Sequence, residues 1–384
     1  MQSLSKNTKI FSLASFFVDI SSEMIIWILP FFLSTVLAAP IFVIGLIDAL
    51  RESVGKLVGI FAGVYADKTG KRKKLIIFGY SLSAAIKAFL IIATSWMHVL
   101  VVIFFERFGK GIRDAPRDAM IVISEKKENL GKAFGFRRMF DTFGAIIGPL
   151  IAMIILAFML NINVENTYRF IFTVALIPAV LAVLILFFIK EESAKMQDEK
   201  KIIMSVLNAK NYKNFIFVSL IFAIGEFTIA LFLLRAGEFV NILYIPLLGM
   251  IFNIFYAMFS VPAGHLTDRI GAKKSLIISW IIFMLAAIGF AFFASFQSVF
   301  ILFAVLGLFT AMYKVAPSVY LSKVIPKEQY ASATGLYQGI ISLAVLPANL
   351  IASLLWSYGP TTVFAFPIAT TVIAIIALNF LVKE

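Results

Sequence analysis

Long apolar segments separated by short polar ones make up nearly the whole chain. Each apolar segment is about 20–28 residues long, the length that a tilted helix needs to cross a bilayer. The pattern predicts about twelve such helices and no strands. We place them near residues 10–38, 41–66, 74–95, 98–123, 132–158, 166–189, 214–236, 241–266, 274–295, 297–323, 331–357 and 361–382. The fold class expected is an all-α integral membrane protein.

Composition supports this expectation. Of the 384 residues, 61% are hydrophobic and only 14% are charged, a balance not found in soluble domains of this size. The chain has no cysteine, which excludes disulfides, thiol catalysis and cysteine-based metal sites. Its two histidines, His98 and His265, are isolated at predicted helix ends, so we expect no metal site and no cofactor.

The net charge of +13 follows from where Lys and Arg fall along the chain. They cluster in alternate loops, whereas the loops between them hold almost no cation besides Arg169. Positive loops stay in the cytoplasm, so the charge does not indicate nucleic-acid binding. We expect a multi-pass protein of the cell (plasma) membrane with both termini cytoplasmic, and the lipid bilayer as its surroundings.

The longest polar stretch, residues 190–213, falls at the middle of the chain. It predicts an N-terminal bundle of six helices over residues 1–190, a cytoplasmic linker over 191–213 and a C-terminal bundle of six helices over 214–384. Two such bundles related as parallel repeats suit an alternating-access transporter with a site near the bilayer midplane.

A short motif is repeated at equivalent places in the two halves. Gly63, Asp67 and Gly70 close the second predicted helix, followed by Lys-Arg-Lys at residues 71–73. The same spacing closes the eighth predicted helix, at Gly264, Asp268 and Gly271. Ordinary topogenic charge would explain the lysines but not the fixed spacing of Asp and Gly.

At these residues the sequence resembles the major facilitator superfamily, over essentially the whole chain. Both turns are similar to the family's loop signature G-x-x-x-D-x-x-G-[RK]-x-[RK]. Arg107 and Gly111 in the fourth predicted helix fit its R-x-x-x-G pattern. Gly144, Gly148 and Pro149 in the fifth resemble the G-x-x-x-G-P motif of its proton-coupled antiporter branch. Gly and Pro are also common in membrane helices for packing alone.

The resemblance implies a fold of two pseudo-symmetric six-helix bundles, a small-molecule substrate and a monomer. It also implies that the two turns latch the halves together when the outside is open and release them for inward opening. The residues assigned to this gate are Gly63, Asp67, Gly70, Arg72, Asp118, Arg138, Gly264, Asp268 and Gly271.

Acidic residues in the first two predicted helices are the candidates for proton coupling. Asp19 and Glu23 share one helical face, near the depth of Arg51 and Glu52 in the next helix. A carboxyl at that depth can be neutral or ionised, depending on hydration and partners. The candidates are therefore Asp19, Glu23 and Glu52. The alternative is a salt-bridge ladder with Arg51 that fixes the two helices together.

Residues 106–119 hold four cations and three acids within a membrane-length segment. Such charge is costly in a bilayer and marks a functional or gating segment. Cross-helix pairs Arg113–Asp141 and Asp118–Arg138 would offset part of the cost. Alternatively, Arg113 and Arg117 could clasp a carboxylate or phosphate.

The C-terminal half carries fewer intramembrane charges, chiefly Glu226 and Lys314. Lys314 lies in the helix of the second half that corresponds to the fourth predicted helix, at the level of that helix's charged residues. We therefore expect it to face a central cavity. Lys87, in a helix that is peripheral in the family, is expected to pair inward. The residues expected to line the substrate cavity are Arg51, Lys110, Arg113, Arg117, Asp141, Glu226 and Lys314.

Together these features predict an alternating-access secondary transporter that exports a small organic molecule in exchange for protons. The alternative within the class is a transporter of organic or phosphate-bearing anions that uses Arg113, Arg117 and Lys314. A polytopic membrane enzyme such as a prenyltransferase would need two Asp-rich magnesium motifs, which the sequence lacks. The absence of a Walker motif argues against an ATP-driven pump. We therefore expect no enzymatic activity.

Overall fold

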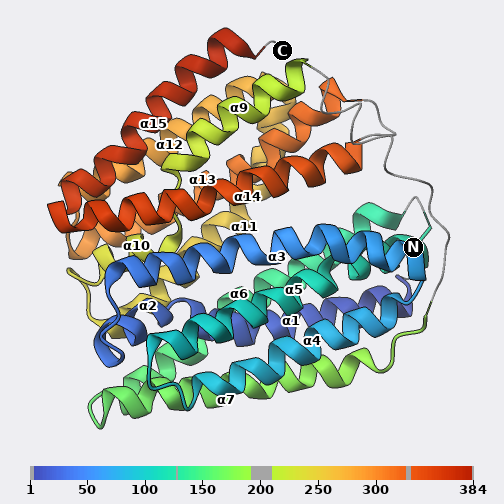
Figure 1. Ribbon diagram of the computed structural model, residues 1–384, viewed down its shortest axis with the longest axis horizontal. Helices are drawn as coiled ribbons and strands as arrows, with labels where there is room; N and C mark the ends of the chain where they lie inside the picture. The colour runs from blue at the N-terminus through green and yellow to red at the C-terminus, as the bar shows by residue number, and fades with distance from the viewer. Residues whose placement is uncertain (1–3, 127–128, 192–209, 326–329, 383–384) are drawn as a thin grey trace. The chain divides into compact units, whose positions relative to one another are not determined.

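The computed structural model of the chain describes residues 4–126, 129–191, 210–325 and 330–382. Within these ranges every regular element is a helix, as expected (Figure 1). The predicted linker, residues 191–213, lies almost wholly outside them. The side chains of Asp67, Lys210 and residues 330–332 are also outside what the structure describes.

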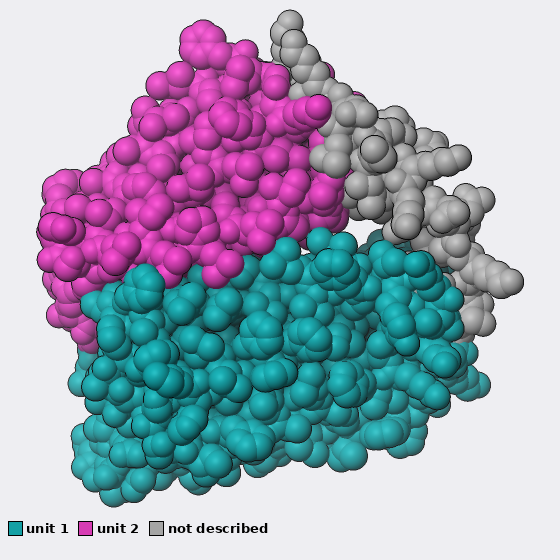
Figure 2. Space-filling view, in the orientation of Figure 1, with its two compact units in different colours: residues 1–196, 241–250 teal, residues 197–240, 251–384 magenta. Residues whose placement is uncertain are grey.

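The chain divides into two compact units (Figure 2). Unit 1 comprises Met1–Met196 and Asn241–Met250, and unit 2 comprises Gln197–Val240 and Ile251–Glu384. The elements of unit 1 are α1 (Lys6–Ile26), α2 (Leu29–Phe31), the π-helical η1 (Phe32–Val36), α3 (Ile41–Thr69), α4 (Arg72–Lys87), η2 (Ala88–Leu90), α5 (Trp96–Ser124), α6 (Leu130–Met159), α7 (Val164–Leu186) and η4 (Ile242–Tyr244).

Unit 2 holds the second half of the helices. They are α9 (Lys210–Gly225), α10 (Ile229–Ala236), most of α11 (Ile245–Ile270), α12 (Ala272–Phe292), α13 (Phe296–Val324), α14 (Tyr330–Leu355), η6 (Trp356–Tyr358) and α15 (Pro360–Leu381). The seventh predicted span is therefore interrupted, because α9 and α10 are separated by residues 226–228.

Nine helical segments of the described chain are long and apolar enough to cross a membrane. The other predicted spans correspond to α3, to α4 with η2, and to α5. Both α3 and α5 are 29 residues long, but their charged residues lower their mean hydropathy. In α5 the side chains of Glu106, Arg107 and Arg113 are buried within unit 1. Charge that is buried against neighbouring helices is compatible with a helix that crosses a bilayer.

The same helix pairs pack together in both units. In unit 1, α1 packs on α6 and α7, and α4 packs on α5 and α7. In unit 2 the corresponding pairs are α9 with α14 and α15, and α12 with α13 and α15. The internal repeat seen in the two sequence motifs therefore extends to helix packing.

A lysine at the start of an equivalent helix caps the last helix of each unit. In unit 1, Lys73 of α4 donates to the carbonyls of Phe187 and Ile189, at 3.2 and 2.6 Å. In unit 2, Lys273 of α12 donates to the carbonyls of Asn379 and Val382, at 3.3 and 2.9 Å. Terminal carbonyls have no partner within their own helix, so a cation satisfies both their hydrogen bonds and the helix dipole.

Glycines bring α5 close to its neighbours. A β-carbon on Gly111 would lie 2.6 Å from the carbonyl oxygen of Gly55 in α3. On the opposite face of α5, a β-carbon on Gly109 would lie 2.7 Å from the carbonyl oxygen of Gly79 in α4. Helices in a bilayer associate through such close contacts, since lipid is as apolar as their side chains. The charged helix α5 is thus clamped between α3 and α4.

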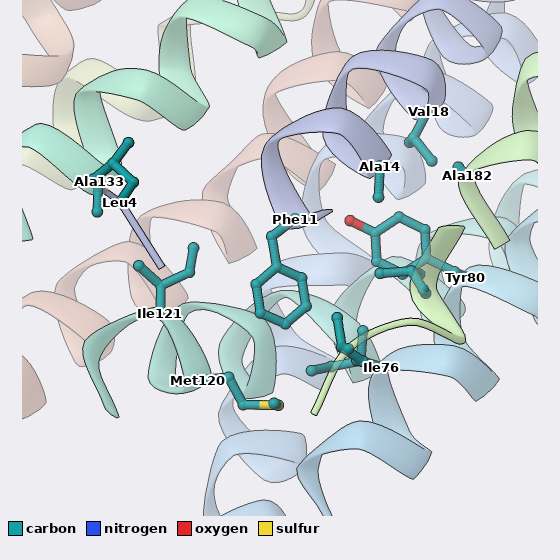
Figure 3. Close-up of a cluster of buried hydrophobic side chains, with 12 residues drawn as sticks. Leu4, Phe11, Ala14, Val18, Ile76, Tyr80, Met120, Ile121, Ala133 and Ala182 are labelled. Carbon is teal, nitrogen blue, oxygen red and sulfur yellow. The ribbon is translucent and has the colours of Figure 1, made fainter. Parts of the chain in front are cut away.

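A cluster of buried side chains joins five helical regions of unit 1 (Figure 3). Its members are Leu4, Phe11, Ala14, Val18, Ile76, Tyr80, Met120, Ile121, Ala133, Ala182, Leu186 and Ile189. Tyr80 brings a hydroxyl into this apolar cluster, and Nη1 of Arg117 lies 3.5 Å from it. The core therefore meets the charged residues of α5 at Tyr80.

Candidate functional site

The two candidate proton carriers of α1 differ in their partners. Asp19 and Glu23 are both partly exposed. Trp27, one turn beyond Glu23, donates from Nε1 to Glu23 Oε2 at 2.8 Å. Asp19 forms neither a hydrogen bond nor an ion pair with any side chain that the structure describes. Of the two acids, Asp19 is the one without a fixed partner.

Charged side chains from four helices nevertheless act on Asp19. The acids are Asp141 and Glu23, and the cations include Lys110, Arg113, Arg138 and Lys87. They come from α1, α4, α5 and α6. Because Asp19 has no ion-pair partner, a proton can bind to it without breaking a salt bridge.

The acids of α3 are held by their own arginine. Arg51 Nε lies 2.5 Å from Asp48 Oδ1, and Arg51 Nη2 lies 3.2 Å from Glu52 Oε1. Both Asp48 and Arg51 are buried. This arrangement matches the salt-bridge ladder considered as the alternative for this helix, except that it stays within α3. It favours a structural role for Glu52 over proton carriage.

The arginines of α5 are engaged by residues within unit 1. Arg113 Nε lies 3.6 Å from Asp114 Oδ1, and its guanidinium lies 4.0 Å from the centre of the Tyr80 ring. Arg117 lies 3.0 Å from both Asp114 and Asp118. Both arginines are buried. Arg117 donates to Asp118 and Tyr80, which weighs against its use as a clasp for a substrate anion. Nε and Nη1 of Arg113 have no hydrogen-bond partner among the described residues, so the anion alternative stays open for Arg113.

Lys110 lies on the same helix as these arginines but has different surroundings. No acid among the described residues lies within ion-pair distance of it, yet it acts electrostatically on Asp19, Glu52 and Asp114. It is partly exposed, unlike Arg113. Lys110 is therefore the cation of α5 best able to respond to a change of charge at Asp19.

Two acids find different partners from those expected. Asp141 Oδ2 lies 3.5 Å from Arg137 Nη1, whereas a pair with Arg113 was expected. Asp118 lies 4.0 Å from Arg137, whereas a pair with Arg138 was expected. Arg137 and Asp141 are four residues apart on α6, where side chains meet readily on one helix face. Asp118 and Arg137 do join α5 with α6, but the two partners predicted for these acids were wrong.

The last glycine of each gating motif lies at the end of a helix. Gly70 ends α3 with φ +66°, and Gly271 precedes α12 with φ +89°. Both angles lie in the left-handed region that only glycine adopts freely. Arg72 is fully buried at the start of α4, whereas Asp268 is exposed. The side chain of Asp67, the proposed latch, lies outside the described residues.

The other two glycines of the motif lie within helices. A β-carbon on Gly63 would lie 3.5 Å from that of Ala115 in α5, an ordinary contact. One on Gly264 would meet nothing within 4 Å among the described atoms. The packing inside each unit therefore does not require glycine at either position.

The antiporter-like motif lies directly against the candidate proton carriers. A β-carbon on Gly144 would lie 2.9 Å from that of Asp19, and one on Gly148 would lie 3.0 Å from that of Glu23. Each would also lie 2.6 Å from a carbonyl oxygen of α1. Pro149 follows within α6. The motif thus forms the face on which α1 presents its two acids.

Glu226 of unit 2 lies in the interruption between α9 and α10. Asn349 Oδ1 of α14 accepts hydrogen bonds from the backbone N–H and the hydroxyl of Thr228, at 3.1 and 2.6 Å. A side-chain hydrogen bond links Glu226 with Tyr313 of α13. Interrupted helices near the midplane are typical of binding sites in transporters. Lys314, the other candidate in this unit, lies 4.7 Å from the Tyr256 ring centre.

Sequence reasoning missed Tyr80 and Trp27. Tyr80 contacts Arg113 and Arg117 of α5, and Trp27 donates to Glu23. The i,i+4 spacing of Glu23 and Trp27 is a signal that was available in the sequence. Tyr80 could not be distinguished from the other aromatic residues without knowing which face of α4 meets α5.

These observations define a class of protein: a polytopic helical membrane transporter built from two repeated halves. The chain belongs to the major facilitator superfamily. The model of that family, Major Facilitator Superfamily, matches residues 11–242 and 215–384. An MFS-type transporter of Methanocaldococcus jannaschii is 35% identical over 386 residues, which cover 98% of this chain and 95% of that protein. The expected family is confirmed, and the protein is a transporter rather than an enzyme.

A shorter match joins the chain to drug-resistance proteins. The multidrug resistance protein MdtH of Photorhabdus laumondii is 33% identical over 109 residues, 28% of this chain and 27% of that protein. Among solved structures, a mutant of the nucleoside transporter NupG has a TM-score of 0.82 at 14% identity, covering 98% of this chain and 100% of that one. A D-xylose-proton symporter has a TM-score of 0.79 at 16% identity, covering 98% and 97%. These structures confirm the superfamily fold.

Proposed function

We propose that this transporter exports a small organic molecule in exchange for protons, and that Asp19 carries the proton. The observation that supports this most is the state of Asp19: it is partly exposed, it has no ion pair among the described residues, and both acids and cations act on it electrostatically. A proton carrier must gain and lose its proton within each cycle. A carboxyl held by an arginine, as Glu52 is, would resist protonation.

The proposed cycle links that proton to substrate binding. With Asp19 ionised, Lys110 and Arg113 are balanced by it. Protonation removes one negative charge and leaves these cations less compensated, which changes the field in the site. Substrate and proton would therefore occupy the site alternately, while the two halves rock about it and the Asp67 turn gates the cytoplasmic side.

Export of a drug-like or metabolite-like molecule is supported by two similarities. The Gly144–Gly148 motif resembles that of proton-coupled antiporters, and it lies against the two acids of α1. The match to the MdtH proteins covers 28% of the chain. We further propose a plasma-membrane location with both termini cytoplasmic, and domains over residues 1–190 and 214–384 joined by the linker 191–213.

Transport by purified protein in liposomes tests the proposal. With ethidium as the probe, an imposed pH gradient should drive ethidium flux, and ethidium should in turn drive proton movement reported by an enclosed pH dye. Asp19→Asn should abolish the response to the gradient. Glu165→Gln serves as the control, since Glu165 is an exposed acid that pairs with Arg169 within α7. Flux that ignores the gradient in the wild type, or still follows it in Asp19→Asn, would contradict the proposal.

A further inference from the structure

Unit 1 contains a small cavity bordered by α1, α2, α4, η2 and α5. Its volume is about 20 Å³. Ile25 and Ile103 belong to its apolar wall, and Lys87, Glu106 and Arg107 to its polar wall. None of the residues proposed to bind protons or substrate lines it. The cavity is therefore lined by other residues than the candidate transport site, although Lys87 acts electrostatically on Asp19.

Lys87 is a buried cation with an incomplete set of partners. Its side chain is 5% exposed. Its ammonium donates to the hydroxyls of Ser21 and Ser22, at 3.0 and 2.9 Å. An ammonium has three N–H donors, so one is left without a partner among the described residues. No carboxylate among them lies within ion-pair distance of this ammonium.

The remaining charges of the polar wall neutralise one another. Arg107 Nε lies 2.7 Å from Glu106 Oε2, and both side chains are buried. That pair has no net charge, so Lys87 leaves the wall with one positive charge in excess. Glu106 and Asp19, the two carboxylates that act on Lys87, lie beyond ion-pair distance and leave its charge incompletely compensated. A buried charge of this kind is costly, and a mobile counter-ion removes that cost.

We propose that this cavity binds one small monovalent anion of the size of chloride, held by Lys87 and by the hydroxyl of Ser22. A water molecule needs about 10–15 Å³ by this measure, so about 20 Å³ admits a single particle of water or halide size. The cavity is partly open, and a carboxylate or phosphate would extend out of it. The excess positive charge selects the halide over water. The ion connects α1 with α4 and α5 and stabilises their packing.

Thermal unfolding of the purified protein in sodium chloride against sodium gluconate, at equal ionic strength, tests the proposal. Chloride should raise the Tm of the wild type saturably, by about 2 °C or more, because a ligand that binds only the folded state stabilises it. Lys87→Met should lose the rise. Ile103→Phe should also lose it, since it fills the cavity and keeps every charge. Lys9→Gln removes an exposed lysine elsewhere in α1 and should keep it.

Crystals grown in sodium bromide give a direct test. An anomalous peak within about 3.5 Å of Lys87 Nζ is expected, the length of a contact between an ammonium and a halide. A wild-type Tm indifferent to chloride, an equal rise in Ile103→Phe, or a water without anomalous signal in the cavity would overturn the proposal. None of these outcomes depends on proton coupling at Asp19.

Discussion

Gly144 of α6 lies against Asp19 of α1 so closely that a β-carbon on the glycine would stand 2.9 Å from that of the aspartate. The same substituent would stand 2.6 Å from the carbonyl oxygen of Phe16. Real β-carbons do not approach backbone this closely, so α6 would have to move. The distance between α1 and α6 at the proposed proton site therefore depends on the absence of one methyl group.

Gly144→Ala should consequently displace Asp19 and impair transport more than stability. We expect transport in liposomes to fall roughly tenfold or more, because a shift of about 1 Å at a working site can cost two orders of magnitude. Overpacking should destabilise the fold by about 1–3 kcal/mol. Initial rates and thermal unfolding measure the two effects.

The matched control lies on the same helix. A β-carbon on Gly135 of α6 would meet nothing within 4 Å among the described atoms. Gly135→Ala should therefore leave transport unchanged and leave stability equal or slightly higher, as alanine favours helix over glycine. Equal losses of transport in both variants would mean that the Gly144 contact has no special role.

Tyr80 should act on the α5 arginines chiefly through its ring. Its ring centre lies 4.0 Å from the Arg113 guanidinium, while its hydroxyl is 3.5 Å from Arg117. Tyr80→Phe keeps the closer contact and should transport within about twofold of the wild type. Tyr80→Leu loses the cation–π contact, worth about 2 kcal/mol when desolvated, and should transport several-fold less. If Tyr80→Phe is as impaired as Tyr80→Leu in liposome assays, the hydroxyl is the important group.

Helices and their order could be predicted from hydropathy, because segment length in a bilayer is fixed by membrane thickness. The repeated motif placed Gly70 and Gly271 at the ends of predicted helices, and both have a positive φ. Partners across helices could not be predicted. Arg113 and Asp141 lie at similar distances from the cytoplasmic ends of their helices, which suggested that they form a pair. That distance does not determine which face of each helix meets its neighbour, and Asp141 instead lies near Arg137. The interruption at Glu226 was also missed, since α9 and α10 form one continuous apolar run in the sequence.

A second close glycine contact offers a test of packing in unit 2. A β-carbon on Gly225, at the end of α9, would collide with Thr370 Oγ1 and stand 2.7 Å from Thr370 Cβ in α15. Gly225→Ala should therefore destabilise the protein by about 1–3 kcal/mol. The double variant Gly225→Ala with Thr370→Gly adds a methyl group at one position and removes the opposing side chain at the other. It should therefore recover part of the lost stability.

Thermal unfolding of the wild type, the two single variants and the double variant completes a double-mutant cycle. Thr370→Gly alone should cost about 1 kcal/mol, because it places a glycine inside a helix. The double variant should then lose less stability than the sum of the losses in the two single variants. Strict additivity would show that α9 and α15 adjust freely at this crossing, contrary to the structure.

Glu125, just past the end of α5, should give the fold a dependence on acidic pH. Burial raises the pKa of this carboxyl, but hydrogen bonds from Thr8 and Ser5 outweigh burial and hold the pKa below its usual range. The backbone N–H of Ser5 lies 2.8 Å from Glu125 Oε1. Glu125 thus ties the start of α1 to the end of α5, and it does so best when ionised.

The depressed pKa fixes the sign of the effect. Ionised Glu125 stabilises the folded state fully above the unfolded-state pKa of about 4.3, and this stabilisation disappears as the pH falls through the lower folded-state pKa. The Tm difference between the wild type and Glu125→Gln should therefore be constant from about pH 5 to 7 and shrink below about pH 4. Thr8→Val removes one of the hydrogen bonds and should make the decline smaller. A difference that stays constant down to about pH 3, or grows as the pH falls, would show that Glu125 does not hold the start of α1 through its charge.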